Sequence, residues 1–158
     1  MRRVLATGLL LTFCAAAVSA QNLDAIKKRR ELMQTIGKAS LANFKMIKDE
    51  APFNLATVQA GLKTFQDELP KFKALFPDDS HVGGGTDASP EIWRSRAKFE
   101  GNIDKFVADA KTVASAIKDE ATFKAEYPKV PANCGLCHER GGGGFAPRLG
   151  DSYKKLNQ

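Results

Sequence analysis

Residues 55–76 read LATVQAGLKTFQDELPKFKALF, and an apolar pattern within them repeats every seven residues. The apolar positions step alternately by three and four: Leu55, Val58, Leu62, Phe65, Leu69, Phe72 and Phe76. This spacing keeps one stripe of a helix apolar and is typical of helices in antiparallel bundles. Pro70 lies inside the pattern, so we expect the helix to kink or to break near Leu69.

The segments on either side show the same helical spacing. Residues 21–48, with Asn22 or Asp24 as the cap, carry a stripe of Ile26, Met33, Ile36, Ser40, Phe44 and Ile47. Ser89 and Pro90 open a third helix, whose stripe is Ile92, Arg96, Phe99, Ile103, Phe106, Ala110, Val113 and Ile117. Residues 120–127 are a short helical piece, and a fresh turn near Pro131 carries residues 134–139. No segment alternates with period two, so the predicted fold class is all-α, an antiparallel four-helix bundle.

The first twenty residues follow the pattern of a secretory signal peptide. Arg2 and Arg3 precede an apolar run at residues 4–18, and small residues favour cleavage near Ala20. The run is short for a membrane anchor. Lipoprotein processing at Cys14 is a minor alternative, because Phe13 is bulky where such signals carry a small residue. We therefore expect a periplasmic protein with a signal peptide at residues 1–20, a bundle at 21–140, and a glycine-rich turn and polar tail at 141–158.

The composition narrows the choice of partners. Removal of the signal peptide lowers the formal net charge from +6 to +4, with the basic residues spread along the chain. This mild excess indicates acidic partners or a faintly anionic surface and does not call for nucleic acid. No segment after Gln21 is apolar for long enough to span a membrane.

The chemistry is concentrated in Cys134-Gly135-Leu136-Cys137-His138, the Cys-x-x-Cys-His signature of c-type haem attachment. Two thiols on one helical turn can reach both vinyl groups of one porphyrin, and the adjacent histidine can then bind the iron. A thiol redox motif usually follows a strand, and a zinc site needs more ligands than these residues and distant His81 offer. A structural disulfide is the remaining alternative. We predict one covalent haem c near the C-terminus.

The sixth iron ligand decides between functions, because His/Met iron transfers electrons whereas an open iron binds gases. Two methionines follow the signal peptide, Met33 and Met46, and they lie 13 positions apart. In a helix this separation corresponds to about 220°. Met33 shares the apolar stripe and Met46 does not, so Met33 is either a ligand or an ordinary core residue. His81, in a glycine-rich loop, is a weaker candidate.

Four short motifs give the chain a resemblance to the class II c-type cytochromes, the cytochrome c′ family. They are the Cys-x-x-Cys-His motif near the C-terminus, the stretch Ser89-Pro90-Glu91-Ile92-Trp93 followed by Ala97-Lys98-Phe99, the stretch Leu75-Phe76-Pro77, and the stretch Lys48-Asp49-Glu50-Ala51-Pro52-Phe53. The resemblance covers roughly residues 23–139, nearly the whole of the mature chain. It implies the same four-helix fold around a covalent haem.

The resemblance also implies roles for single residues. Family members carry a basic residue and, four positions later, the residue on the distal side of the haem; Arg29 and Met33 match these positions. Members with leucine or phenylalanine at the distal position are five-coordinate and bind nitric oxide or carbon monoxide, whereas members with methionine are low-spin. The resemblance therefore implies His138 and Met33 as iron ligands. It suggests that Arg29 or Arg30, and also Arg96, pair with the haem propionates, and that Trp93 packs beside the haem edge.

Two departures from the family pattern stand near the motif. Glu139-Arg140 and four glycines follow His138, where members usually continue the helix with an aromatic and a basic residue. Pro128 and Pro131 replace glycines that commonly precede the motif. Residues 144–151 look like the stretch after the haem motif in class I cytochromes, but no methionine follows His138 to serve as a ligand there.

Together these patterns predict a periplasmic electron carrier with one His/Met-ligated haem. A five-coordinate member that binds nitric oxide or carbon monoxide is the alternative, and a thiol–disulfide protein without haem is a third hypothesis. We do not expect an enzyme, because no residue set is arranged for acid–base chemistry. Relatives often dimerise through the first two helices, which suggests a homodimer by analogy.

Overall fold

The computed structural model describes residues 22–138, and this part of the chain contains helices and no strand. Its α-helices are α1 (Leu23–Ile47), α2 (Leu55–Lys73), α3 (Glu91–Arg94), α4 (Arg96–Ala116) and α5 (Glu120–Glu126). Three 3-10 helices complete it: η1 (Asp78–Ser80), η2 (Tyr127–Lys129) and η3 (Pro131–Leu136). The predicted all-α class is confirmed.

Side-chain caps fix where three of the helices begin. The side chain of Asn22 accepts a hydrogen bond from the Ala25 amide at 3.0 Å, and that of Asn54 accepts one from the Thr57 amide at 2.9 Å. Asp119 and Thr122 form a reciprocal capping box at the start of α5. Each cap satisfies a backbone donor that the first helical turn leaves without a partner.

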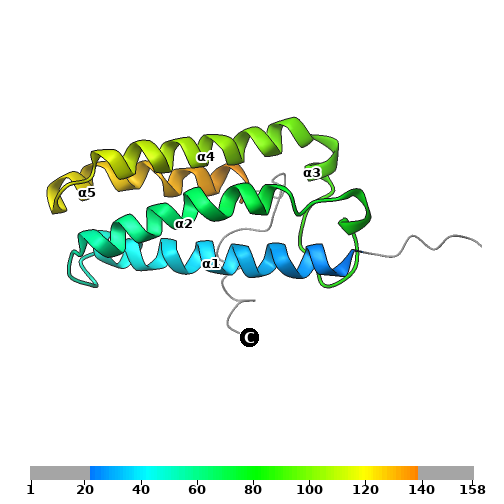
Figure 1. Cartoon of the computed structure of the whole chain (residues 1–158), viewed down its shortest axis with the longest axis horizontal. Coiled ribbons are helices and arrows are strands. Elements are labelled where there is room, and N and C mark those ends of the chain that lie inside the picture. Colours follow the sequence, from blue (N-terminus) through cyan, green and yellow to red (C-terminus); the bar gives the residue numbers. More distant parts are fainter. Residues whose placement is uncertain (1–21, 139–158) are drawn as a thin grey trace, which may run out of the picture.

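The long helices pack as a bundle around one core. Figure 1 shows α1, α2 and α4 running alongside one another, with α5 and the segment after it lying against α4. Rings from different segments meet in the core: Phe65 of α2 and Phe106 of α4 lie 5.2 Å apart between centroids, and Phe76, after α2, lies 4.8 Å from Phe99 of α4. Burying an aromatic or aliphatic side chain contributes roughly 1.5–3 kcal/mol. The apolar stripes read from the sequence therefore supply the main stabilisation of the bundle.

Two helices differ from the sequence-based expectation. The predicted break near Leu69 is wrong, since α2 continues through Pro70 to Lys73. Pro70 is exposed, and its missing backbone donor removes one helical hydrogen bond without ending the helix. The third predicted helix is divided into α3 and α4 at Ser95, whose backbone takes φ −119° and ψ 44° while its hydroxyl donates to the Glu91 carboxylate.

The fourth helical segment is the least regular. After α5 the chain passes through η2 and then η3, which begins at Pro131 as the sequence predicts and ends at Leu136. Neither Pro128 nor Pro131 carries a backbone donor, so an uninterrupted α-helix is disfavoured here. The expected signal peptide and the glycine-rich tail lie outside the described residues.

A membrane-spanning helix needs about 20 mainly apolar residues. Between residues 22 and 138, no helix combines that length with that apolarity.

Candidate functional site

A cavity of about 820 Å³ lies between α1, α2, α4 and the segment that carries the cysteines. Its volume falls within the range of cofactor and ligand pockets, roughly 300–1,000 Å³. Most of its walls are apolar, formed by residues such as Ile26, Ile36, Leu69, Phe72, Phe76, Ile92, Phe99, Ile103 and Phe106. Cys134, Cys137 and His138 line one side, and Met33 lines the α1 side. The fold thus brings the four predicted attachment and ligand residues to one cavity.

The turn around Cys134 places the three motif residues along the cavity. The carbonyl of Cys134 accepts hydrogen bonds from the Cys137 amide at 3.3 Å and from the His138 amide at 2.9 Å. The two cysteines are not joined in a disulfide. Burial raises the pKa of Cys134 to about 11, and burial together with the neighbouring Cys134 raises the pKa of Cys137 to about 11. Both thiols are therefore protonated at neutral pH.

Two asparagines hold this turn in place, and neither was identified from the sequence. Asn133 is only 4% exposed, and its Nδ2 donates to the Asp109 carboxylate at 2.8 Å and to the carbonyls of Lys129 and Val130 at 3.3 and 3.2 Å. The Asn102 side chain donates to the Leu136 carbonyl at 3.2 Å and also bonds to the Cys137 thiol. The position of Asn133 directly before Cys134 was the one available signal for it. Asn102 could be identified only from the tertiary structure, because its partner Leu136 is distant in the sequence.

Asp109 links the turn to the outer surface of α4. Two hydrogen bonds lower the pKa of the Asp109 carboxyl. The one from Lys105 has the larger effect, and the one from Asn133 has the next largest. A charged acceptor makes a stronger hydrogen bond than a neutral one. The segment that carries the cysteines is therefore anchored to α4 by side chains as well as by apolar packing.

The two methionines of the described chain occupy different environments. Met33 is half-buried, packs against the core and lines the cavity. Met46 is 4% exposed, and its sulfur accepts a hydrogen bond from the Asn54 amide at 3.3 Å. The spacing placed Met46 off the apolar stripe, yet it is buried because the chain after α1 folds back over it. Met33 is the methionine that faces the cysteines across the cavity.

Arg29 places a buried positive charge beside the cavity. It is 5% exposed. Its guanidinium donates to the hydroxyl of Ser80 at 2.9 Å and to the backbone carbonyl of Ser80 at 2.8 Å. It also donates to the Leu75 carbonyl at 3.2 Å and to the Thr86 hydroxyl at 2.5 Å. Among residues 22–138 no carboxylate pairs with it, and burial, with a smaller contribution from Arg30, lowers its pKa to about 10. An unneutralised guanidinium at the wall suits a ligand that carries carboxylates.

Arg30 fixes the glycine-rich loop at the same end of the cavity. Its guanidinium donates to the carbonyls of Gly84 and Gly85 at 2.9 and 2.7 Å. Both glycines take positive φ, 55° and 65°, a region that favours glycine. A Cβ on Gly84 would lie 3.1 Å from a Leu23 methyl group, so a larger residue would also crowd α1.

Three other candidates lie outside the cavity lining. Trp93 stands behind Phe76, with the two rings 5.9 Å apart, and its indole nitrogen donates to the Pro77 carbonyl at 3.3 Å. Arg96 donates to Glu100 at 2.6 Å and to the Phe76 carbonyl at 2.7 Å. His81 is exposed, and its Nδ1 donates to the Asp78 carbonyl at 2.6 Å. Trp93 and Arg96 support the wall from outside, and His81 lies on the outer surface.

The residues present fit a covalently attached haem. Two thiols and an imidazole lie together on one wall, a thioether lies on the facing wall, and the space between them is apolar and large enough for a cofactor. No group of three or more His, Cys, Asp or Glu side chains within residues 22–138 could hold a bare metal ion. The described residues therefore form no zinc site of this kind, an alternative that the sequence already disfavoured.

Known proteins resemble this chain along most of its length. The family described as Cytochrome C′ matches residues 24–140. A cytochrome c′ of Rhodopseudomonas palustris is 37% identical over 139 residues, covering 88% of this chain and 95% of the relative. A cytochrome c-556 of the same species is 34% identical over 143 residues, with the same two coverages.

The fold agrees with these relatives. The crystal structure of cytochrome c′ from Rhodopseudomonas palustris superposes with a TM-score of 0.74 at 38% identity, covering 80% of this chain and 98% of that one. The expected four-helix bundle and the single covalent haem c are thereby confirmed. The chain belongs to the cytochrome c′ family, the class II c-type cytochromes.

Proposed function

We propose that the protein is a periplasmic electron carrier whose one covalent haem c has His138 and Met33 as its iron ligands. The observation that carries this proposal is the position of Met33, which lines the same cavity as Cys134, Cys137 and His138. A methionine sulfur opposite a histidine is the usual arrangement for electron transfer, whereas an open sixth position serves gas binding. The similarity to a cytochrome c-556 as well as to a cytochrome c′ fits an electron carrier of this family.

The haem supplies an iron that changes reversibly between the ferric and ferrous states. Cys134 and Cys137 would hold it through thioether bonds, and His138 and Met33 would bind the iron from opposite walls. The apolar residues around the cavity exclude water. Arg29 would place its positive charge near the acidic groups of the cofactor, since within residues 22–138 no carboxylate neutralises it. Ligands held on packed helices need little movement when the iron changes charge.

The raised pKa values of the cysteines weigh against a thiol–disulfide protein. A reactive cysteine is a thiolate at working pH, so its pKa is lowered. Burial has the opposite effect on Cys134 and Cys137, each of which has a pKa of about 11. Protonated, half-buried thiols beside a large cavity are poor nucleophiles for exchange and are well placed for attachment of a cofactor.

The second candidate function is the binding of nitric oxide or carbon monoxide at five-coordinate iron. The chain is 37% identical to a cytochrome c′, so gas binding is tested beside electron transfer. It requires Met33 to stay off the iron or to be displaced by the gas. The two functions therefore differ in the state of one bond.

The test is an absorption spectrum of the mature holoprotein, produced in a periplasm with haem-maturation machinery. Ferric and ferrous spectra are recorded with and without carbon monoxide. Low-spin spectra that the gas leaves unchanged are expected for His138/Met33 ligation. High-spin spectra that shift on addition of carbon monoxide would overturn the electron-carrier proposal and establish gas binding in its place.

Export to the periplasm belongs to the same proposal, and we propose no catalytic activity for the protein. The sequence pattern at residues 1–20 supports delivery to the periplasm, with cleavage near Ala20. Mass spectrometry of the secreted protein would locate the new N-terminus.

A homodimer is proposed by analogy with relatives, and sedimentation of the holoprotein would test it. Trp93, outside the cavity lining, is proposed to position Phe76.

A further inference from the structure

The second half of α1 presents lysines and apolar side chains on one outer face. Lys38, Leu41, Lys45 and Lys48 are spaced by three, four and three residues, which places them on the same side of the helix. All three lysines are exposed, and Leu41 and Phe44 are 43% and 41% exposed. We call Lys38, Leu41, Phe44, Lys45 and Lys48 the α1 face. Exposed apolar residues grouped with one sign of charge are a common mark of an interaction surface.

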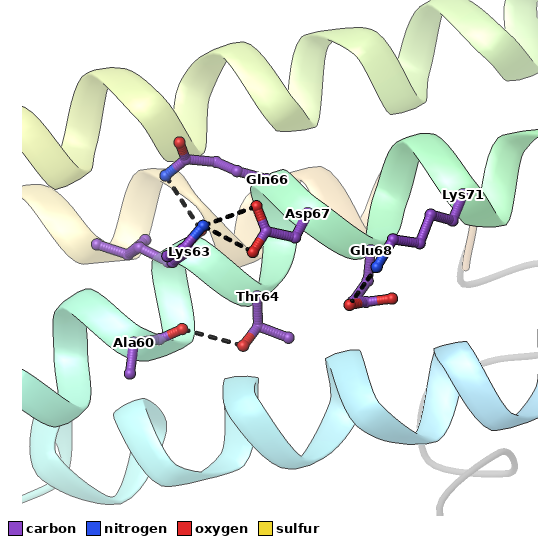
Figure 2. A network of polar contacts seen from close by, with 8 residues as sticks. Ala60, Lys63, Thr64, Gln66, Asp67, Glu68 and Lys71 are labelled. Carbon is purple, nitrogen blue, oxygen red and sulfur yellow. Dashed lines mark hydrogen bonds and ion pairs between the residues drawn. The ribbon is translucent and has the colours of Figure 1, made fainter.

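The lysines of the α1 face lack the ion pairs that lysines form on the neighbouring helix. Figure 2 shows α2, where Lys63 pairs with Asp67 at 2.8 Å and Lys71 pairs with Glu68 at 2.9 Å. Lys73, the third lysine of α2, pairs with Asp104 of α4 at 2.6 Å. On the α1 face, by contrast, no carboxylate of residues 22–138 lies within ion-pairing distance of the lysines. Lys48 instead lies over the Phe44 ring, 4.7 Å from its centroid.

Two of the nearby carboxylates pair with other lysines, and the exposed Glu50, whose amide donates to the Lys45 carbonyl at 2.9 Å, forms no ion pair with the α1 face. Glu31 pairs with Lys27 at 3.9 Å, and Asp49 pairs with Lys124 at 2.8 Å. The α1 face therefore keeps its positive charge, whereas the charge of α2 is largely neutralised within its own surface. Three lysines without ion pairs, opposed by the single carboxylate of Glu50, leave a local positive potential that attracts acidic molecules.

The α1 face borders the cavity of the haem. Leu41 and Phe44 line that cavity from the α1 side. Leu41 also lines a shallow groove of about 390 Å³ on its other side, together with Lys38, Lys45 and Pro52. Leu41 is thus a ridge between the cavity and a lysine-lined groove. A protein seated on this ridge lies next to the cofactor, which is where an electron must enter or leave.

We propose that the α1 face is the docking surface for an acidic redox protein, whose carboxylates meet Lys38, Lys45 and Lys48 around a small apolar contact on Leu41 and Phe44. The proposal rests on the electron-carrier function proposed above. Transient redox complexes use small interfaces, below about 1,200 Å². Opposite charges at their rim raise the association rate more than they raise the affinity.

Charge argues against two other occupants of this surface. A second copy docked through a two-fold axis at the α1 face would bring the same three lysines into opposition, so the homodimer proposed above would use other surfaces of the first two helices. The tail at residues 141–158 carries Arg148, Lys154 and Lys155 against one acidic side chain, Asp151. Both occupants would add positive charge to a surface that already has it in excess, whereas an acidic protein would neutralise it.

The test compares two charge-reversed holoproteins with the wild type. One carries K38E, K45E and K48E. The matched control carries K98E, K111E and K118E, which reverse three exposed lysines that also lack ion pairs within the described chain but lie on or just after α4. Both variants change the net charge equally. Reduction of the haem by reduced flavodoxin, an acidic protein, is followed by stopped flow at low and high ionic strength.

The α1-face variant should react with flavodoxin about tenfold more slowly than wild type at low ionic strength, a loss typical of removed electrostatic steering. The difference should disappear as salt is raised, and the α4 control should stay within about threefold of wild type. Equal losses in both variants would show that net charge alone matters. Equal rates in all three proteins would show that the α1 face plays no part. Either result would overturn the proposal.

A neutral electron donor separates the docking surface from the function itself. Reduced lumiflavin carries no docking surface, so it should reduce all three proteins at the same rate. If lumiflavin reduces none of them, the electron-carrier function fails. If lumiflavin reduces all of them while flavodoxin does not discriminate between them, only the docking surface fails.

Carbodiimide cross-linking identifies the occupant directly, because it joins lysines to carboxylates in contact with them. Peptide mapping of the wild-type holoprotein mixed with flavodoxin should find Lys38, Lys45 or Lys48 linked to flavodoxin. Links from these lysines to a second copy of the chain, or to Asp151 or the C-terminal carboxylate, would assign the surface to a dimer or to the tail. Either assignment would overturn the proposal.

Discussion

The two walls of the cavity are built in opposite ways. The α1 wall belongs to one uninterrupted 25-residue helix, capped by Asn22, and regular helical geometry presents Arg29, Met33 and Leu41. The wall that carries Cys134, Cys137 and His138 is a short 3-10 turn that begins at Pro131, with the two residues after it, and side chains from α4 hold it. Residues 134–138 are consecutive, yet they need side chains from α4 to hold their position. Arg29 and Leu41 lie twelve positions apart, yet the regular helix alone positions them.

This difference shows where each wall is vulnerable. On the α1 wall a substitution removes the contribution of one side chain and leaves the helix intact. On the opposite wall, loss of a supporting hydrogen bond can displace the whole attachment turn, because a 3-10 segment of six residues has little regular structure of its own. Four substitutions test this contrast, beginning with the largest expected effect.

Replacing both cysteines, Cys134→Ser with Cys137→Ser, should abolish covalent haem attachment. Serine keeps the size of the side chain but cannot form the thioether bond. Haem staining of the denatured protein on a gel, with the mass of the intact chain, measures the loss. Each single substitution serves as the control and should retain one attachment. A double variant that keeps haem after denaturation would contradict the assignment.

Met33→Leu should convert the low-spin spectrum to a high-spin one and allow carbon monoxide to bind. Leucine fills a similar volume but offers no sulfur to the iron. Met46→Leu is the matched control, because Met46 is buried away from the cavity and should leave the spectrum unchanged. An unchanged spectrum in Met33→Leu would remove Met33 as a ligand.

Arg29→Met should lower the free energy of unfolding of the holoprotein by about 2–4 kcal/mol. The substitution removes four hydrogen bonds from a buried guanidinium and leaves the Leu75 and Ser80 carbonyls without that donor. Arg30→Met, at an exposed position, should cost less than about 1 kcal/mol. Urea denaturation followed by circular dichroism measures both. Equal costs would mean that burial of Arg29 does not matter to the fold.

Asn133→Ala should lower the free energy of unfolding by about 1–3 kcal/mol, because it removes the hydrogen bonds of a buried side chain to the Asp109 carboxylate and to the Lys129 and Val130 carbonyls. Asn102→Ala removes a partly buried bond to Leu136 and should cost less. Thermal unfolding of the two holoproteins, with attached haem measured per chain, ranks the supports. A larger effect of Asn102→Ala would show that the Asn102 side chain on α4, and not the Asn133 side chain of the turn, is the main support of the attachment turn.

Much of this fold could be predicted from the sequence because bundle helices depend on local spacing. Most of the stripe positions at residues 26–47, 55–76 and 92–117 lie on α1, α2, α3 and α4, and Asn22 caps α1 as the sequence predicted. The failures are also local in origin. Pro70 does not break α2, and Ser95 interrupts a stripe whose spacing predicted one helix.

The haem site could be predicted only in part, for a different reason. The Cys-x-x-Cys-His signature is contiguous, so residues 134–138 could be identified without a fold. The supports Asn102 and Asp109 could not, since they lie on α4 and meet the turn only when the bundle closes. The structure places the Trp93 ring beside that of Phe76, and contact of Trp93 with the haem edge stays a prediction.

The sequence by itself determined most of the helices and the attachment motif, and it placed Met33 on the apolar stripe of the first helix. The tertiary structure decided which residues meet. It set Met33 across one cavity from Cys134 and His138, buried Arg29 without a carboxylate in the described chain, and left the lysines of the α1 face unpaired beside that cavity. The physical reason is range. Helical propensity and periodicity act over a few residues, whereas burial, charge neutralisation and the shape of a cavity depend on which distant segments pack together.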